Sequence, residues 1–337
     1  MDVAVVGASG YAGAELLRLL AGHPEARVVA ATGESAKGKL VAEHTPALGA
    51  LYPSLVLTGV EDLSDVPLDT VFLALPHGRS QEMAGTFLER GIRVVDLGAD
   101  YRLRDPRDYA TWYGAEHRDP QRLGDAVYCL VERHRDEIPG ASLLAIPGCY
   151  PTASSLALGP FLDRGVVETS SVVVNALSGV SGAGRSPNDR LHFPRLASNA
   201  EAYGLLRHRH TVEIEREIGA EVLFTPHLVP VARGMLVSAY ARVRGDLDTA
   251  GALAILRETY DQEPFVVVTE EPPTLKDPVG SNLCFVSARV DPRTGWLLVM
   301  SSLDNLVKGA AGQAVQAWNV ASGVEEITGL PRAGVTP

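Results

Sequence analysis

Cys149 has the sequence surroundings of a reactive thiol. It lies between Gly148 and Tyr150, with a proline on either side of that triplet, after an apolar run and before a helical pattern. A thiol at the start of a helix has a lowered pKa, so the thiolate is available near neutral pH. The flanking glycine and prolines indicate a fixed backbone here. We therefore expect Cys149 to be a nucleophile rather than a packing residue.

The other cysteines have different surroundings. Cys129 and Cys284 lie within apolar, strand-like runs, and we expect both to be buried packing residues. The chain has 3 cysteines, an odd number, and none of them has CxxC spacing. This pattern argues against a disulfide framework and against a zinc site, so we predict three thiols and no metal ligands.

His210 is the candidate acid or base for such a thiol. It stands with His208 where histidines are concentrated, just before a helical pattern. Thr211 is predicted to cap that helix, which places His210 before the helix and Glu213 in its first turn. A carboxylate there could orient a histidine or a ligand. Because Cys149 and His210 are distant in sequence, their meeting depends on the fold.

A glycine-rich turn near residue 10 has the pattern of a dinucleotide-binding site. Gly7, Gly10 and Gly13 form a GxxGxxG sequence that follows an apolar run at 3–6 and opens a helical pattern. Glycines let the backbone approach a pyrophosphate, and the helix start offers unpaired N–H groups. The spacing differs from GxGxxG, so a glycine-rich turn without a ligand stays the alternative at this point.

The segment after the second predicted strand bears on which dinucleotide is bound. Sites for NAD usually carry an acid there to hold the ribose 2′-hydroxyl, whereas sites for NADP carry cationic or hydroxyl groups. Ser35 and Lys37 fit a 2′-phosphate, while Glu34 argues against one. On balance the sequence favours NADP, in the form of NADPH for a reductase.

The composition limits the classes of partner. The chain has 337 residues, a length typical of two domains, and 46% of them are hydrophobic. Its 30 basic and 41 acidic residues give a net charge of −11 without basic runs, so no nucleic acid and no anionic membrane is expected as a partner. We find no secretory pattern and no apolar run of membrane-spanning length. A cytoplasmic protein is therefore expected.

The elements that must position these residues change character along the chain. As far as residue 100, short apolar runs alternate with helical patterns, which predicts an α/β fold with a doubly wound parallel sheet of the Rossmann type. The runs are unbroken, as expected of strands covered on both faces. The predicted strands are 3–6, 27–32, 69–76 and 93–100, and the predicted helices are 12–24 and 80–91.

After Cys149 the pattern changes to longer strands separated by turns rich in glycine and serine. Alternating apolar and polar positions predict a mixed or antiparallel sheet with one open face. A helical pattern at 305–323 is expected to pack on the first domain. We thus predict a first domain at 1–148 plus 308–337 and a second, α+β domain at 149–307. The predicted strands of the second are 170–179, 235–245, 265–271, 282–291 and 296–304.

Motifs occur in order along nearly the whole chain: GASGYAGAELLRLL (7–20), LALPHG (73–78), DLGADYRL (96–103), PGCYPT (147–152), SGVSGAGR (178–185), AYGLLRHRHTVEIE (202–215), FTPHLVP (224–230), RGM (233–235) and DNLVKGAAGQAVQ (304–316). In these motifs together the chain resembles the N-acetyl-γ-glutamyl-phosphate reductases of arginine biosynthesis, within the aspartate-semialdehyde-dehydrogenase superfamily. Several motifs in order are more specific than any one. Glu34 departs from the family, where a basic residue is frequent at this place.

The resemblance implies that Cys149 is the nucleophile and His210 the general acid or base. It also implies a dinucleotide-binding first domain, a catalytic and dimerisation second domain, and a homodimer or homotetramer. Residues implied near the substrate are Arg102, Tyr203, His208 and Glu213. Residues implied around the cofactor, together with Ser35 and Lys37 from the argument above, are Gly7, Ser9, Gly10, Tyr11, Ala12, Gly13, Leu75, Pro76, His77, Gly78, Ser178, Gly179, Gly182 and Asn305.

The reaction that this resemblance implies is the NADPH-dependent reduction of N-acetyl-γ-glutamyl phosphate to N-acetyl-L-glutamate 5-semialdehyde and phosphate. The hypothesis is that Cys149 displaces phosphate to form a thioester, which hydride then reduces while His210 handles the proton. A Gly-, Ser-, Pro- and Asn-containing segment at 183–202 is predicted to be a mobile cover.

Three alternatives stay open. The first is a reductase of a carrier-bound aminoadipyl phosphate from lysine synthesis, although such relatives depart at the PGCYPT motif and this chain does not. The second is a cysteine acyltransferase or hydrolase without nicotinamide, which would leave the glycine-rich turn at 7–13 unused. The third is a catalytically inactive nucleotide-binding subunit, which would not require Cys149 and His210 together.

Overall fold

The computed structural model describes residues 1–335, which form two compact units. The first unit consists of Met1–Pro147 with Ala310–Leu330, and the second consists of Gly148–Gly309 with the chain from Pro331 onward. The chain therefore leaves the first unit beside Cys149 and returns to it after Gly309.

The last stretch of chain differs from the predicted domain division, which assigned all of 308–337 to the first domain. From Pro331 onward the backbone belongs to the second unit. There the carbonyl of Pro331 accepts a hydrogen bond from the amide of Asn282, and the amide of Val335 donates to the carbonyl of Val279, each at 2.8 Å. Residues 336 and 337, which the prediction also placed in the first domain, lie outside the described residues.

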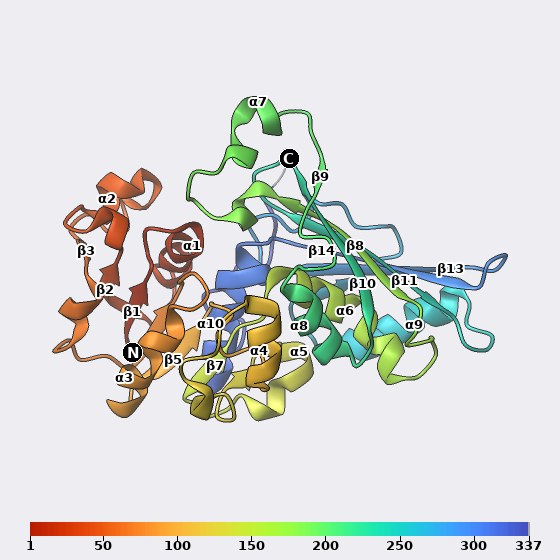
Figure 1. The fold of residues 1–337 in the computed structure, drawn as a ribbon, viewed down its shortest axis with the longest axis horizontal. Helices are drawn as coiled ribbons and strands as arrows, with labels where there is room; N and C mark the ends of the chain where they lie inside the picture. The colour runs from red at the N-terminus through yellow and green to blue at the C-terminus, as the bar shows by residue number, and fades with distance from the viewer. Residues whose placement is uncertain (336–337) are drawn as a thin grey trace. The chain divides into compact units, whose positions relative to one another are not determined.

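A seven-stranded parallel sheet forms the centre of the first unit within the described residues (Figure 1). Every residue from Val3 to Val6 and from Thr70 to Leu73 is buried, as expected of strands covered on both faces. The sheet confirms the predicted doubly wound fold. In spatial order its strands are β3 (Leu57–Thr58), β2 (Arg27–Thr32), β1 (Asp2–Val6), β4 (Thr70–Leu73), β5 (Arg93–Asp96), β7 (Leu143–Ala145) and β6 (Val127–Tyr128).

The strand order changes direction between β1 and β4, the two central neighbours. Ligands of doubly wound sheets bind at such a switch point, beyond the carboxyl ends of the strands. The glycine-rich turn at 7–13 follows β1, and the turn at 75–78 follows β4. Both turns that the sequence assigned to the cofactor therefore follow the two strands that flank the switch point.

Helix α10 (Gly312–Ala321) brings the distal part of the chain into the first unit, as predicted. It contacts α1 (Tyr11–Leu20) and β5. The fully buried Trp318 donates from Nε1 to Thr70 Oγ1 at 3.0 Å, and its ring lies 5.8 Å from that of Phe72. The shorter helices of this unit are α2 (Val41–His44), α3 (Ala84–Glu89), α4 (Pro106–Tyr113) and α5 (Val131–His134).

Three predicted helices begin or end differently in the structure. The helix predicted at 12–24 ends at Leu20. The helix predicted at 80–91 consists of a 3-10 turn at Ser80–Glu82 and α3, because the backbone of Met83 leaves the helical region at φ −132°. The helix predicted at 305–323 starts with a π-helical turn at Val307–Ala311, before α10.

The second unit contains a seven-stranded mixed sheet within the described residues. Most neighbours are antiparallel, but β8 pairs with β10 in parallel, and so does β12 with β13. Burial alternates along β8 and β11, which confirms one covered and one more open face. In spatial order the strands are β12 (Val266–Val268), β13 (Cys284–Asp291), β14 (Trp296–Leu303), β11 (Met235–Arg242), β8 (Val172–Gly179), β10 (Val222–Val229) and β9 (Glu201–Ala202).

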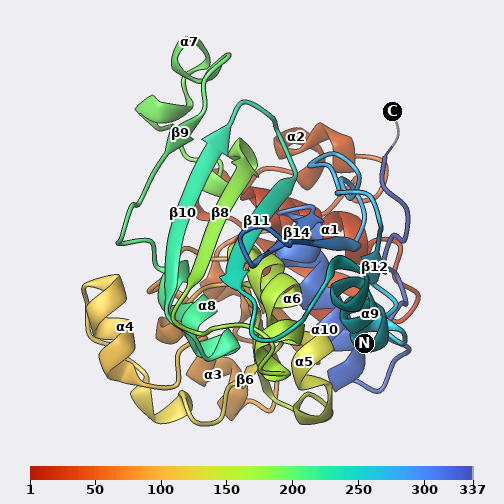
Figure 2. The ribbon, with the colours of Figure 1, turned by 90° about the vertical axis from the view of Figure 1, so that its right-hand side faces the viewer.

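Helices α6 (Cys149–Asp163), α8 (His210–Ile218) and α9 (Thr249–Tyr260) lie on the covered side of this sheet (Figure 2). The segment 183–202 contains the short α7 (Phe193–Leu196) and β9. Because α6 and α8 start with Cys149 and His210, the fold places both predicted catalytic residues at helix N-termini. No helix among residues 1–335 is long and apolar enough to cross a membrane.

Candidate active site

Cys149 is the first residue of α6, as the sequence predicts. The preceding Gly148 has an extended backbone, with φ −70° and ψ 157°, and the helix has no side-chain cap. The Cys149 side chain is half-buried, and the positive end of the helix dipole favours a negative charge at this position. Cys129 and Cys284 are buried thiols, as predicted. Burial raises the pKa of Cys129, which keeps that thiol protonated.

Gly309 allows the chain to pass close to the nucleophile. A Cβ atom at this position would lie 2.7 Å from Cys149 Cβ, so a larger residue would push the helix start away. Gly309 belongs to the π-helical turn at Val307–Ala311, an element that is rare and often found near functional sites. Gly309 was not among the predicted site residues, although it lies within the KGAAG part of a motif.

Glu213 links the starts of the two helices. Its carboxylate, on a side chain that is only 2% exposed, accepts a hydrogen bond of 2.8 Å from the Gly148 amide. This amide precedes Cys149, whereas Glu213 lies in the first turn of α8, one turn after His210. A charge-assisted bond of this kind fixes backbone geometry strongly in a buried place. The predicted position of Glu213 in the first helical turn is confirmed.

His210 is the first residue of α8, and its helix is not capped by Thr211. The cap position is Arg209, and Thr211 lies inside the first turn, where its amide donates to the carbonyl of His208 at 2.9 Å. The prediction of Thr211 as the cap was therefore wrong. The backbone turns into the helix earlier, because the His208 side chain accepts the amide proton of His210 on Nδ1 at 3.2 Å.

His208 is a neutral acceptor in this arrangement. Burial, and then the nearby charge of Arg209, lower the pKa of His208 to about 4. Its Nδ1 atom receives a proton, so the neutral ring carries its own proton on Nε2. The rings of His208 and His210 lie 4.9 Å apart. His208 therefore supports the backbone at His210 and does not compete with it for protons near neutral pH.

Two tyrosines connect the thiol to the histidines. The ring of Tyr150, the residue after Cys149, lies 5.7 Å from that of His210 and 5.5 Å from that of His208. The Tyr150 and Tyr203 hydroxyls are 3.0 Å apart. Burial is the main cause of the raised pKa of both tyrosines, which is about 12 for Tyr203, and the electrostatic interaction with Cys149 contributes to the increase. The fold thus brings the predicted residues Cys149, Tyr203, His208 and His210 into one cluster.

A second predicted group lies at the carboxyl end of β8, which ends at Gly179. The Asn305 side chain accepts a hydrogen bond from the Gly234 amide at 2.8 Å and donates to Ser181 Oγ at 2.9 Å. A Cβ at Gly182 would lie 3.2 Å from Ser178 Oγ and 3.6 Å from Asn305 Nδ2. Ser178, Gly182 and Asn305 therefore lie close together, and at the neighbouring Gly179 a Cβ would lie 2.9 Å from the Arg233 backbone.

The glycine-rich turn in the first unit fits a dinucleotide. Gly7 has φ +86°, and a Cβ there would lie 2.3 Å from the carbonyl oxygen of Ala74. A Cβ at Gly13 would lie 2.3 Å from the carbonyl oxygen of Gly7. Helix α1 begins after Gly10 without a side-chain cap, which leaves its first amides for an anion. The turn carries the predicted residues Ser9, Tyr11 and Ala12.

The two residues expected at a 2′-phosphate, Ser35 and Lys37, have different surroundings. Ser35 Oγ lies 3.4 Å from Ser9 Oγ, beside the glycine-rich turn. Lys37 forms an ion pair with Glu61 and approaches Asp62 at 3.8 Å. The bond to Glu61 is the main cause of the raised pKa of Lys37, and the charge of Glu34 contributes. Lys37 thus already has acidic partners that a 2′-phosphate would have to replace.

The predicted residues Leu75, Pro76, His77 and Gly78 form the turn after β4. Gly78 has φ +85°, and the ring of His77 lies 5.7 Å from that of Tyr113. Arg102 follows β5 in the same unit, and one of its terminal nitrogens donates to the carbonyl of Leu97 at 2.9 Å. Both places lie after the carboxyl ends of the parallel strands.

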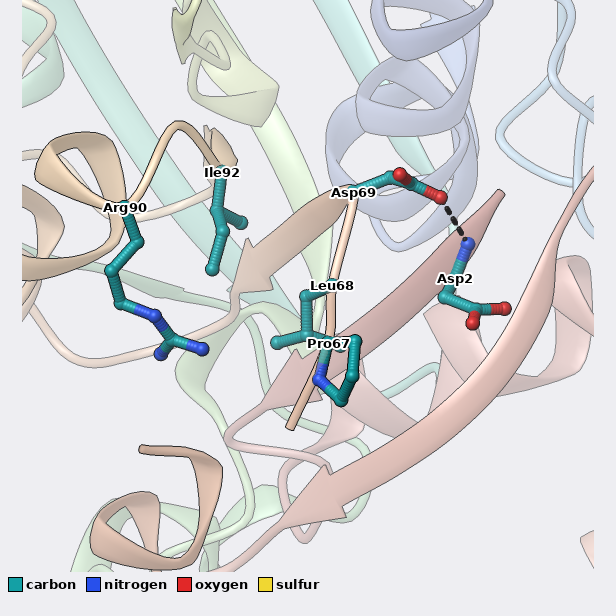
Figure 3. Close-up of a pocket in the computed structure, with 6 residues that line it drawn as sticks. All are labelled: Asp2, Pro67, Leu68, Asp69, Arg90 and Ile92. Carbon is teal, nitrogen blue, oxygen red and sulfur yellow. Dashed lines mark hydrogen bonds between the residues drawn. The ribbon is translucent and has the colours of Figure 1, made fainter. Parts of the chain in front are cut away.

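An open pocket of about 280 Å³ lies elsewhere, beside the amino ends of β1, β4 and β5 (Figure 3). Its polar groups have partners within the unit. The Arg90 guanidinium donates to the carbonyls of Leu63 and Val66, and Asp69 accepts the amide of Asp2 at 2.7 Å. Ligands of doubly wound sheets bind at the opposite edge, so this pocket is not the candidate site.

Comparisons with known proteins give the family context of this arrangement. A family described as "Semialdehyde dehydrogenase, NAD binding domain" matches residues 2–141. A family described as "Semialdehyde dehydrogenase, dimerisation domain" matches residues 149–305. The second match begins at Cys149, beside the point where the chain passes from the first unit to the second.

Two curated relatives are similar over essentially their full length. N-acetyl-gamma-glutamyl-phosphate reductase of Symbiobacterium thermophilum is 46% identical, covering 98% of each chain. The protein of the same name from Geotalea daltonii is 44% identical, covering 100% of each chain. Among solved structures, aspartate semialdehyde dehydrogenase II of Vibrio cholerae complexed with ASA has a TM-score of 0.71 at 19% identity, over 95% of this chain and 97% of that one. At that identity the likeness concerns the fold.

Proposed function

Because the chain belongs to the family of N-acetyl-gamma-glutamyl-phosphate reductases, we propose that it reduces N-acetyl-γ-glutamyl phosphate to N-acetyl-L-glutamate 5-semialdehyde and phosphate. The step belongs to arginine biosynthesis, and the cofactor is NADPH. The observation that carries the proposal is the cluster of Cys149, Tyr150, His208 and His210 at two helix starts. A cytoplasmic location, expected from the sequence, stays part of the proposal.

Covalent catalysis by Cys149 divides the reaction into two easier steps. His210 takes the thiol proton, and Sγ attacks the acyl carbonyl. The bond between the carbonyl carbon and the phosphate oxygen breaks, phosphate leaves and takes up one proton from the solvent, and a thioester remains on Cys149. The amides at the start of α6 can stabilise the negative charge that forms on the carbonyl oxygen.

NADPH, when bound, supplies the hydride that reduces the thioester carbonyl. The carbon–sulfur bond then breaks, the semialdehyde leaves, and His210 returns its proton to Sγ. General acid and base assistance of this kind contributes roughly 10²–10⁴-fold to a rate. His208 stays neutral throughout, because its pKa is lowered to about 4.

The remaining residue assignments follow from this scheme. The first unit is the dinucleotide-binding domain, in which the residues of the 7–13 and 75–78 turns, with Ser35 and Lys37, hold the cofactor. Ser178, Gly179, Gly182 and Asn305 complete its surroundings. Arg102, Tyr203 and His208 contact the substrate. For Glu213, the bond to the Gly148 amide supports a positioning role at the helix start.

The second unit is also the dimerisation domain in this proposal. On the open face of its sheet, the half-exposed Leu236 pairs across strands with Leu177, and Tyr240 pairs with Leu298. An apolar sheet face of this kind suits a second copy of the same chain. We therefore propose a homodimer, or a homotetramer built from such dimers.

A direct assay tests the proposed activity. The purified protein should oxidise NADPH, followed by absorbance at 340 nm, when N-acetyl-γ-glutamyl phosphate is added, and not with the aminoadipyl phosphate bound to its carrier. In reverse, it should reduce NADP with the semialdehyde only when phosphate is present. Phosphate release in many turnovers without any nicotinamide would instead favour a cysteine hydrolase.

A further inference from the structure

Asp100 holds the backbone of the turn that follows β4. Its carboxylate is fully buried. Oδ1 accepts hydrogen bonds from the Gly78 amide at 2.6 Å and the Tyr109 hydroxyl at 3.0 Å. Oδ2 accepts from the amides of Ser80 and Gln81 at 3.0 and 3.2 Å. One carboxylate therefore accepts hydrogen bonds from three backbone amides of a single turn.

These amides need such an acceptor. Gly78 lies at φ +85°, and a 3-10 turn starts at Ser80, so the backbone here cannot pair its N–H groups in a regular helix or strand. Buried amides without an acceptor are costly, and bonds to a charged acceptor are stronger than those to a neutral one. The carboxylate of Asp100 thus selects this backbone conformation over others.

The surroundings hold Asp100 itself in place. His117 Nε2 lies 2.8 Å from the Asp100 carbonyl oxygen, and the His117 ring packs edge-on against Tyr109 with centroids 4.8 Å apart. Gln81 Nε2 donates to the Tyr109 hydroxyl at 3.0 Å. Tyr109 on α4 is therefore bonded to the Asp100 carboxylate, and His117 in the loop before 120 is bonded to the Asp100 carbonyl, so Asp100 is held by both segments and can act as a rigid support.

We propose that Asp100 is a positioning residue for the cofactor, and that it keeps the Leu75–Gly78 turn in its binding conformation before NADPH arrives. The inference rests on the proposed function, in which this turn contacts NADPH. Asp100 touches neither cofactor nor substrate in this scheme. Because Asp100 orders the turn in advance, NADPH binding does not have to supply the free energy of ordering it. Loss of the Asp100 carboxylate therefore weakens the affinity for NADPH more than it slows the chemistry at Cys149.

The test compares NADPH affinity in the wild type and in Asp100→Asn. The amide group of asparagine has one acceptor oxygen, and its NH2 must face either Gly78 and Tyr109 or Ser80 and Gln81, donor against donor. We expect the dissociation constant for NADPH, from a fluorescence titration, to rise on the order of 10-fold to 100-fold. The burst of phosphate from the acyl phosphate without NADPH, which reports Cys149 alone, should keep its rate.

A matched control separates positioning from general damage. Asp119 is also a buried carboxylate of the first unit, and it accepts hydrogen bonds from Tyr101 at 2.7 Å and Arg122 at 2.8 Å. Asp119→Asn should lower the melting temperature while the NADPH dissociation constant stays within about 2-fold of the wild type. Equal losses of affinity in both variants would overturn the inference.

The other outcomes are also decisive. If Asp100→Asn folds and binds NADPH as tightly as the wild type, the inference fails and the proposed function stands. If the wild type itself binds no NADPH, both fail. Should Asp100→Asn not fold, amide hydrogen exchange in the wild type decides. Slow exchange at Gly78, Ser80 and Gln81 before NADPH is added supports the inference, and fast exchange there overturns it.

Discussion

Cys149 and Cys129 are thiols in opposite surroundings, which gives a sharp test at the residue scale. Cys149→Ser should lower NADPH oxidation by at least about 10³-fold, because a serine hydroxyl has no comparable ionised form at neutral pH. The phosphate burst should vanish as well. Cys129→Ala is the control, since it removes a buried thiol together with its weak hydrogen bond of 3.1 Å to the Val127 carbonyl and leaves Cys149 unchanged. Retained phosphate-dependent reduction in Cys149→Ser would contradict the thioester scheme.

Glu213 can be assigned to positioning or to substrate contact by two substitutions. Glu213→Ala leaves the buried Gly148 amide without this acceptor, and we expect kcat to fall roughly 10-fold to 100-fold, from a cost of 1–3 kcal/mol. The KM for NADPH should not change. Glu213→Gln keeps an acceptor oxygen, so most of the activity should return. If Gln is as damaging as Ala and the KM for the acyl phosphate rises in both, Glu213 contacts the substrate.

The candidate site could be predicted from the sequence only in part. Cys149 was recognisable because glycine, prolines and a following helical pattern are local signals. Three contacts of the site join residues that are far apart along the chain. They are the bond between Glu213 and the Gly148 amide, the close approach of Gly309 to Cys149, and the bond between Asp100 and the Gly78 amide. No local pattern reports such contacts, so only the fold reveals them.

At the element scale, the carboxyl end of β5 contains a buried acid whose protonation depends on pH. Asp96 is fully buried and accepts hydrogen bonds from Ser80 Oγ at 2.6 Å and the Gly98 amide at 2.8 Å. Burial, and then the charge of Asp100, raise the pKa of Asp96 from 3.8 to about 7. The folded protein therefore keeps the proton on Asp96 across a range in which the unfolded chain has lost it.

The sign of the effect on stability follows from linkage. Between pH 4 and pH 7 the unfolded chain releases the proton of Asp96 and the folded protein does not, so rising pH favours unfolding; above about pH 7 this contribution stops changing. In Asp96→Asn the contribution is absent. From pH 5 to pH 8, the free energy of unfolding measured by urea titration should thus fall by more in the wild type than in the variant. Parallel pH profiles would contradict the protonated state of Asp96.

The helices and strands could be predicted where the apolar residues of a segment follow one regular pattern, either one buried face or complete burial. The strand predicted at 27–32 coincides with β2, Arg27–Thr32. Strand β10 was not predicted as a strand, because Pro226 and His227 interrupt its apolar alternation. The parallel pairing of β8 with β10 depends on a long connection between them, and nothing in either strand specifies it. Pairing partners are decided by the chain path rather than by local propensity.

At the scale of the whole molecule, the open face of the second sheet should decide the oligomeric state. Leu236 lies on that face near the start of β11, paired with Leu177 on β8 and with Ser302 on β14. Leu236→Asp would place a charge in the proposed apolar interface, where burial of an unpaired charge is strongly unfavourable. Light scattering after size exclusion should give twice or four times the chain mass for the wild type and a lower mass for the variant.

A substitution of the same kind away from the sheet provides the comparison. Leu51, which is 50% exposed in the first unit, can be changed to Asp without altering the proposed interface. Leu51→Asp should keep the mass of the wild type. Because Cys149 and His210 lie on helices of the covered face, the separated subunits of the Leu236→Asp variant should still release a phosphate burst from the acyl phosphate. A mass that stays unchanged in Leu236→Asp would show that the copies associate through another surface.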